Sequence, residues 1–251
     1  HQNINKTANL ELFSSIYVDE NLSGWLPHFF AQMTLMQPID AELRSHKLPS
    51  LLSGGHPSYE IGQKREAVDG ILEVADQIII PAGSATSRWV GTSEFDALAN
   101  QLGATEGWAV NSGHSGLTAE VPFEKDTALI QCFTDQPHPQ LGNGLLVTLT
   151  LPFDVKQKHV GVTAHALNFF EARVWTEVPQ FGCWHSRDTA TERGTVAAHA
   201  IFVPNALFRS GLVQNLVIWQ IARARWVRES FFPHAEDRPM SEIYRGRYKH
   251  L

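Results

Sequence analysis

The sequence has few cysteines, a small charge excess and no long apolar run, and each shortage excludes a class of protein. Its two cysteines, Cys132 and Cys183, are too few for a disulfide framework or a four-thiolate zinc site. No apolar run reaches the ~18 residues needed to cross a bilayer. Lysines and arginines number 20 against 26 aspartates and glutamates, a net charge of −6, which argues against nucleic acid as a partner.

The apolar content, by contrast, is ample. Of the 251 residues, 43% are hydrophobic and 18% charged, which excludes a disordered chain or a fibre. The first residues, HQNINKTANLELF, lack the charged and apolar regions of a signal peptide, so we expect a soluble, cytoplasmic protein. Both cysteines lie in apolar surroundings, which predicts buried and unbridged thiols.

The chain divides by texture into two regions and a tail. Residues 1–91 form a helical, loop-rich N-terminal extension, residues 92–232 mix strands and helices, and residues 233–251 form a tail of mixed charge. Within the extension, apolar residues recur on one helical face over Val68–Ile79, and we expect Pro81 to end that helix.

The second region predicts an α+β domain. Its alternating apolar residues over 145–151 are typical of a strand, which we expect to be central. Helices are predicted from Ser93, which has capping-box spacing to Asp96, over 163–175 and over 212–232; strands are predicted over 117–123, 127–133, 145–151, 181–185 and 196–203. In the resulting order, α-β-β-β-α-β-β-α, strands follow one another without intervening helices. The sheet should therefore be largely antiparallel, which excludes a doubly wound nucleotide-binding fold.

Several stretches carry a resemblance to a known fold. They are TALIQCF, GNGLLVTLTLP, ALNFFEARVW, FGCWH, VAAHAIFVPNAL and LVQNLVIWQIARARWV. In this order they resemble the type III secretion chaperone-like fold and, within it, the bacterial sensory-transduction-regulator group. The resemblance covers about residues 92–232 and departs at the N-terminal extension and at the proline-rich loop 134–144. It implies a non-enzymatic adaptor or chaperone-like accessory protein that binds another protein or forms a homodimer.

Candidate catalytic groups are present but incomplete. Cys183 and His185 are two residues apart on a predicted strand, so they share one face and could form a thiolate–imidazole pair. Ser115, in SGHSG, resembles a nucleophile elbow, but the second glycine comes one residue early and a strand follows, which favours a β-turn. The alternative function is therefore a hydrolase or transferase using Cys183 and His185, or Ser115, in a cleft between the two regions.

The 12 histidines lack the spacing of a metal site, because neither an H-x-x-x-H pair on a predicted helix nor an HExxH motif occurs. His185 and His199 would become neighbours if their strands paired, which gives two ligands at most, whereas zinc takes three or four. We therefore expect no metal and no cofactor.

The last predicted helix carries the most suggestive surface. Trp219, Arg223 and Trp226 are spaced to share one stripe along it. Two interpretations stay open: the helix over Val68–Ile79 covers the stripe, or a partner protein or second copy does, with the arginine stacked on tryptophan. We take these three as the candidate partner-binding residues.

Overall fold

The computed structural model describes residues 75–123, 126–139, 141–155, 160–173, 181–187 and 195–231, together with Gln37, Ile39 and Glu73. The chain divides into two compact units, His1–Ala75 and Asp76–Leu251, and nearly all described residues belong to the second. This boundary comes earlier in the chain than the change of texture at residue 91. Most of the helix expected over Val68–Ile79 and the whole tail 233–251 lie outside the described residues.

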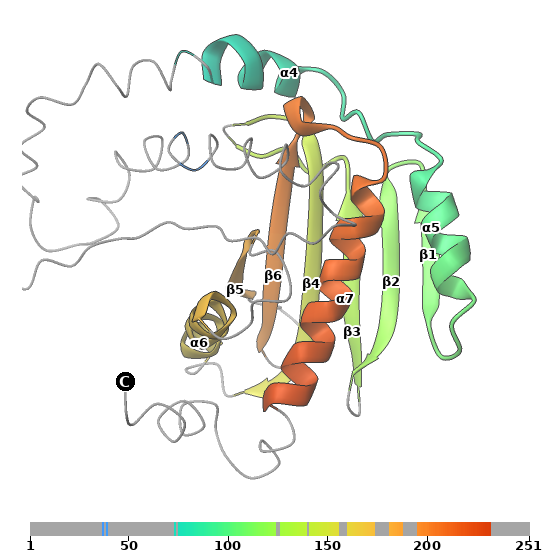
Figure 1. The fold of residues 1–251 in the computed structure, drawn as a ribbon, viewed down its shortest axis with the longest axis vertical. Coiled ribbons are helices and arrows are strands. Elements are labelled where there is room, and N and C mark those ends of the chain that lie inside the picture. Colours follow the sequence, from blue (N-terminus) through green and yellow to red (C-terminus); the bar gives the residue numbers. More distant parts are fainter. Residues whose placement is uncertain are drawn as a thin grey trace, which may run out of the picture. The chain divides into compact units, whose positions relative to one another are not determined.

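One antiparallel sheet of six strands dominates the described part of the second unit (Figure 1). The strands are β1 (Ala109–Gly113), β2 (Gly116–Phe123), β3 (Asp126–Phe133), β4 (Gly144–Val155), β5 (Cys183–Arg187) and β6 (Thr195–Pro204). Their order across the sheet is β1-β2-β3-β4-β6-β5. β4 pairs with both β3 and β6, so the expected central strand and the α+β class are confirmed.

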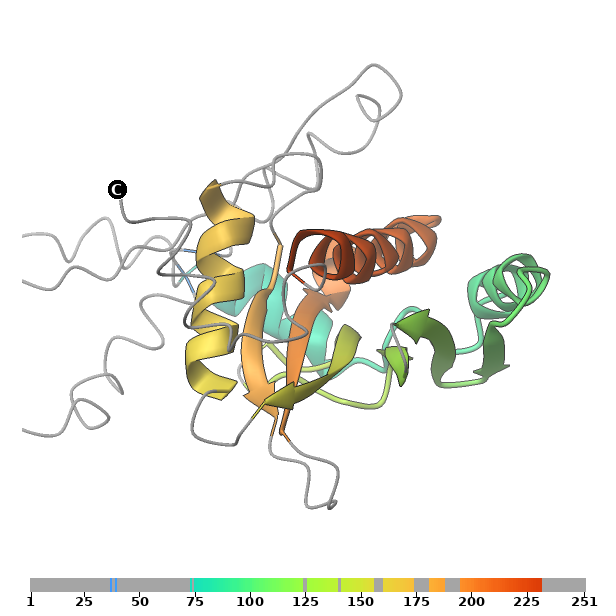
Figure 2. The same ribbon diagram turned by 90° about the horizontal axis from the view of Figure 1, so that it is seen from below.

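α5 (Glu94–Gly103) and α7 (Leu212–Phe231) lie on one side of this sheet, whereas α6 (Val160–Arg173) stands beside its β5 edge (Figure 2). The helical elements are the π-helical turn η1 (Ala75–Ile79), α4 (Ile80–Ser84), α5 (Glu94–Gly103), α6 (Val160–Arg173), the 3₁₀ turn η3 (Asn205–Leu207) and α7 (Leu212–Phe231). α5 packs on β1 and β2, α7 on β3 and β4, and α6 on β5 and β6. The expectation that Pro81 ends a helix is wrong: Pro81 lies in the first turn of α4, where its missing N–H costs no hydrogen bond.

The alternation of side chains along each strand sets which face carries the core. Four leucine and valine side chains of β4 are fully buried, namely Leu145, Val147, Leu149 and Leu151. Their neighbours across β3 and β6 on the same face are also buried, so a slip of one residue would turn the whole apolar row away from the helices. Burial of each leucine contributes about 1.5–3 kcal/mol, which fixes the register.

β1 adds a strand to the predicted order. Its sequence, Ala-Val-Asn-Ser-Gly, lacks apolar alternation and is exposed apart from the partly buried Val110. It forms because the turn His114–Ser115 folds it back onto β2 with Gly113 opposite Gly116. A Cβ at Gly116 would lie 1.9 Å from the carbonyl oxygen of Cys132, so that close approach of strands requires glycine. SGHSG is therefore a hairpin turn, as its spacing favours.

The capping box expected at the start of α5 does not form. Ser93 occupies the N-cap position, but its side chain makes no capping hydrogen bond. Asp96 instead accepts a hydrogen bond from the hydroxyl of Ser112 at 2.6 Å, so this carboxylate connects α5 to β1. The spacing of Ser93 and Asp96 predicted the start of the helix correctly. It was wrong about Asp96, whose carboxylate binds Ser112 and does not cap the helix.

Neither cysteine is in a disulfide, as expected. The register gives the reason: Cys132 lies opposite Val147 on the helix-covered face, whereas Cys183 lies opposite Ala200 and faces the other side. Cys132 is buried, and burial raises the pKa of its thiol to about 12. Cys183 is exposed, so the expectation of a buried thiol is wrong for this residue.

Asn205 fastens the segment before α5 to the end of the sheet. Its side-chain nitrogen donates to the carbonyl oxygens of Ala82, Ala85 and Thr86 at 3.0, 3.1 and 3.1 Å. Its side-chain oxygen accepts from the backbone N–H of Arg88 at 3.0 Å. Asn205 is fully buried, and the hydrogen bonds that it makes to these backbone groups are partly buried.

We therefore expect Asn205→Ala to lower the free energy of unfolding by about 1–3 kcal/mol, since it removes the hydrogen bonds of several partly buried backbone groups. Asn205→Asp should destabilise as strongly, because a carboxylate keeps the acceptor and loses the donor. Urea denaturation measures both, with the exposed Asn100→Ala on α5 as the control. An Asn205→Ala protein as stable as that control would contradict this role.

Candidate functional site

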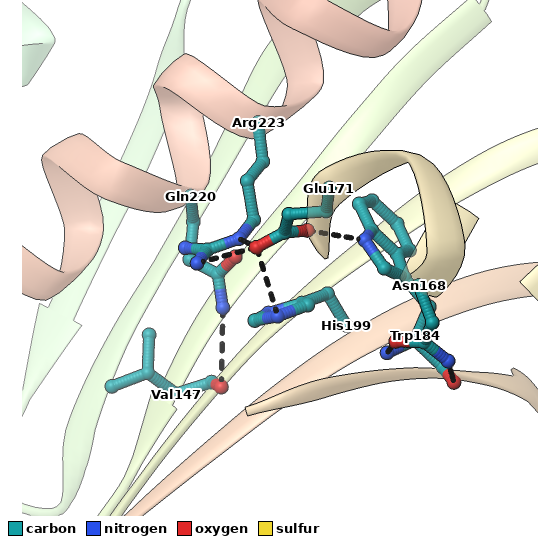
Figure 3. A network of polar contacts seen from close by, with 7 residues as sticks. All are labelled: Val147, Asn168, Glu171, Trp184, His199, Gln220 and Arg223. Atoms are coloured by element: carbon teal, nitrogen blue, oxygen red, sulfur yellow. Dashed lines mark hydrogen bonds and ion pairs between the residues drawn. The ribbon is translucent and has the colours of Figure 1, made fainter. Parts of the chain in front are cut away.

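A buried ion pair joins α6 to α7 on the helix-covered side of the sheet (Figure 3). Nε and Nη2 of Arg223 each lie 2.8 Å from Oε1 of Glu171. Arg223 is fully buried and Glu171 is 5% exposed. Burial lowers the pKa of Arg223, and the adjacent carboxylate opposes that shift. The guanidinium stays charged because arginine starts from a pKa above 12.

The other oxygen of this carboxylate holds the edge strand β5. Trp184 donates its indole N–H to Oε2 of Glu171 at 2.6 Å. One turn earlier on α6, Asn168 accepts from the backbone N–H of Trp184 and donates to its carbonyl oxygen, both at 2.8 Å. Residues three apart lie on one face of a helix, so α6 holds both the side chain and the backbone of Trp184.

His199 of β6 completes the network without adding charge. It lies opposite Trp184, with ring centroids 5.2 Å apart and edge-on packing, and its Nε2 is 4.0 Å from Oε1 of Glu171. Burial, together with the positive charge of Arg223, lowers the pKa of His199 well below its usual value, and a contact with Gln220 partly opposes this. The imidazole is therefore neutral near pH 7.

Gln220 connects the network to the centre of the sheet. Its side-chain nitrogen donates to the carbonyl oxygen of Val147 at 3.4 Å, across from α7 to β4. Gln220 is fully buried, as is Arg223 one turn later on the same helix. The network thus spans α6, α7, β4, β5 and β6, and its groups contact protein rather than solvent. A network buried in this way holds the helices against the sheet, and a substrate in solution cannot reach it.

The three residues expected to bind a partner have different surroundings. Trp219 is 6% exposed and packs on Phe181, with ring centroids 6.0 Å apart. Arg223 is held by Glu171, while Trp226 is partly exposed. Glu171 and Phe181, which the sequence analysis did not consider as cover, both contact this stripe. The partner-binding role of the three residues stays a prediction, in which Trp226 is the accessible member.

Cys183 and His185 share a face of β5, as expected, and both are exposed. They lie opposite Ala200 and Ala198, on the side of the sheet away from the ion pair. The expected pairing of His185 with His199 is wrong, because His199 lies opposite Trp184 and therefore on the other face. Within the residues that the structure describes, no three histidines, cysteines or acidic residues gather as metal ligands.

Ser115 lies in the turn between β1 and β2, at the far edge of the sheet from β5. Its carbonyl oxygen accepts from the backbone N–H and the hydroxyl of Thr134, at 2.9 and 2.8 Å. The residue therefore fixes the hairpin to the start of the loop after β3. Ser115, in the turn beside β1, and Cys183, on β5, therefore lie toward opposite edges of the sheet.

The two edges of the sheet are treated differently. At β5, Asn168 occupies the backbone N–H and carbonyl oxygen of Trp184, which a further strand would otherwise use. At β1, α5 packs on the strand's face, and among the described residues its backbone pairs only with β2. Because the two-residue turn makes Gly113 and Gly116 a hydrogen-bonded pair, Val110 and Ser112 direct their backbone groups outward. β1 is thus an open edge, which no sequence pattern indicated.

Comparisons with protein-family models, with curated proteins and with solved structures found no match for this chain. The resemblance to the chaperone-like fold therefore stays a prediction, and the functional argument depends on the geometry of the described residues. Among the helices that the structure describes, none is long and apolar enough to cross a membrane.

The ion pair makes a direct prediction about stability. Glu171→Gln or Arg223→Met alone should lower the free energy of unfolding by about 3–5 kcal/mol, because each leaves a buried charge without its partner. The double variant should lose less than the sum of the two. Glu229→Gln, which breaks the exposed Arg225–Glu229 pair, is the matched control and should leave the unfolding midpoint unchanged. Additive losses in denaturant titrations would contradict a coupled pair.

His199 predicts a dependence of stability on pH. Unfolded histidine takes up a proton near pH 6.5, whereas folded His199 has a pKa well below that value. Between pH 7 and pH 5 the unfolded state therefore binds more protons than the folded state does. As the pH falls through this range, the free energy of unfolding declines by up to about 1.4 kcal/mol per pH unit. His199→Phe should flatten this slope, while the exposed His165→Gln should not. Equal slopes in all three proteins would exclude His199 as the cause.

Proposed function

We propose that this chain is a non-enzymatic protein-binding module, an adaptor or chaperone-like accessory protein, that takes an extended segment of its partner along β1. The observation that carries the proposal is the difference between the two sheet edges. At the β5 edge the amide of Asn168 occupies the backbone of Trp184, whereas the backbone groups of Val110 and Ser112 face outward at the β1 edge. An exposed edge of this kind pairs with an added strand through main-chain hydrogen bonds.

β1 also lacks the features by which proteins protect an edge from pairing. Residues 109–113 contain no charged side chain and no proline, and the register with β2 runs without a bulge. α5 covers the face of the strand, leaving its outer side to a partner. Asn168 at the opposite edge is such a protective feature, and among the described residues none plays that part at β1.

The size of β1 limits the strength of the contact. Two outward residues offer up to four main-chain hydrogen bonds, each contributing about 0.5–1.5 kcal/mol net. The backbone contribution alone therefore gives weak, reversible binding, with a Kd of roughly tens of millimolar to tens of micromolar. Weak and exchangeable binding suits an adaptor or chaperone, and side-chain contacts beyond the backbone must supply any further affinity.

The stripe on α7 is a second proposed contact. Ile218, at 44% exposed, and Trp226, partly exposed, leave apolar surface on a helix whose Trp219 and Arg223 are buried. Aromatic side chains of this kind are frequent anchors of protein interfaces. We place the main site at β1 because its backbone groups there have a defined direction and number.

We expect a nine-residue peptide of alternating threonine and valine to bind the full chain, with amide chemical-shift changes centred on β1. Val110→Pro removes one outward N–H without removing a bond to β2, so it should weaken binding by roughly two- to tenfold while the fold persists. Glu229→Gln, in the exposed Arg225–Glu229 pair on α7, serves as the matched variant elsewhere and should leave this contact unchanged.

Peptides N-methylated along one edge provide a test that needs no variant protein. Methylation on the edge that meets β1 should abolish binding, and methylation on the opposite edge should not, because only the first removes the pairing N–H groups. Equal binding of the two methylated peptides, or shift changes located away from β1, would refute docking at this edge.

A further inference from the structure

We infer that the segment docking on β1 is basic and carries two lysines or arginines three positions apart, one meeting Glu120 and the other Asp96. This inference rests on the proposed function, because it names the chemistry of the partner at the same edge. It depends on three observations: the local charge, the placement of the two carboxylates on opposite faces, and the small side chains of β1 between them.

The charge around β1 is of one sign. Residues 89–123, all of which the structure describes, contain four acidic residues and no lysine or arginine, although the whole chain has 20 of these basic residues. The four are Glu94, Asp96, Glu106 and Glu120. Asp96, Glu106 and Glu120 are exposed. An approaching strand therefore meets a negative surface, which favours a positively charged partner.

The two carboxylates nearest β1 lie on opposite faces of the sheet. Glu120 of β2 lies directly opposite Ala109, so the two side chains share a face. Asp96 of α5 accepts the hydroxyl hydrogen bond of Ser112, on the face that α5 covers. Ala109 and Ser112 are three residues apart, an odd spacing that puts their side chains on opposite faces of the strand.

This placement sets the spacing in the partner. A strand added at β1 would lie about 4.8 Å from it and about 10 Å from β2. Alanine at position 109 leaves room for a long side chain to pass over it toward Glu120, and serine at 112 does the same toward Asp96. Basic residues facing both carboxylates must therefore stand three apart in an extended segment.

The same charges argue against a second copy of this chain at the edge. Antiparallel pairing of β1 with its counterpart would set two copies of the same acidic surface against each other. Like charges placed together across an interface disfavour the pairing. The occupant that fits is a basic extended segment of a different protein.

The test compares three nine-residue threonine–valine peptides that differ at two positions three apart, where they carry lysine, glutamine or glutamate. The lysine peptide should bind the full chain more tightly than the glutamine peptide, by roughly two- to fivefold for each charge pair. The glutamate peptide should bind more weakly than both. The advantage of lysine should disappear in 0.5 M NaCl, where charges are screened within about 4 Å.

Variants of the chain assign the effect to the two carboxylates. The double variant Asp96→Asn, Glu120→Gln should abolish the preference for lysine and retain binding of the glutamine peptide. Asp135→Asn changes an exposed acidic residue in the loop after β3 and should leave the preference intact. Lysines placed two positions apart lie on the same face of the strand, so only one of them can meet a carboxylate. The gain in affinity over the glutamine peptide should then fall to that of a single charge pair.

The outcomes separate this inference from the proposed function. Equal affinity of the lysine and glutamine peptides would overturn the basic partner and leave docking at β1 in place. Absence of binding by all three peptides, or shift changes centred on another surface, would overturn both. A lysine preference that survives in the Asp96→Asn, Glu120→Gln protein would overturn the assignment to these two carboxylates.

Discussion

The carboxylate of Glu171 is the contact on which the described fold most depends. One oxygen receives the guanidinium of Arg223 and the other receives the indole N–H of Trp184, so a single side chain joins α6, α7 and β5. Burial makes this arrangement all-or-none, because an unpaired charge there would find no water. Because its pKa is lowered, His199 is neutral. It therefore adds no third charge to the pair formed by Glu171 and Arg223.

The placement of α6 by Glu171 also decides which edge of the sheet is closed. Asn168, one turn earlier on the same helix face, reaches the backbone of Trp184 only while α6 stays in position. The amide then hydrogen-bonds the backbone of Trp184 as another strand would. Among the described helices none plays this role at β1, where α5 packs on the face instead. The proposed binding edge is thus the counterpart of a stabilising contact on the opposite side of the sheet.

Local sequence patterns predicted most of the strands and helices, because alternation and helical periodicity report burial directly. The strand at 145–151 shows this well, since its apolar row is the buried face of β4. β1 was missed because Ala109–Gly113 has no buried row, and the tight turn that forms it is a property of the hairpin as a whole. A strand can be predicted from its own residues when one of its faces is buried, and cannot when neither face is.

The candidate site was harder to predict, because its contacts join residues far apart in the chain. The spacing of Trp219, Arg223 and Trp226 indicated a shared stripe correctly but carried no information on Glu171, which lies 52 residues before Arg223. Asn168 gave no signal at all, since an asparagine in a helix is ordinarily a solvated residue. The two edges become distinguishable only when α6 and β5 are placed in space.

Amide hydrogen exchange of the full chain, read residue by residue by NMR, tests the central claim that one edge is closed and the other open. We predict slow exchange at Trp184, whose N–H is held by Asn168 although β5 is an edge strand. We predict fast exchange at Val110 and Ser112 and slower exchange at Asn111 between them, whose N–H is directed toward β2. Fast exchange at Trp184, or protection of Val110 and Ser112 equal to that of Asn111, would contradict the account.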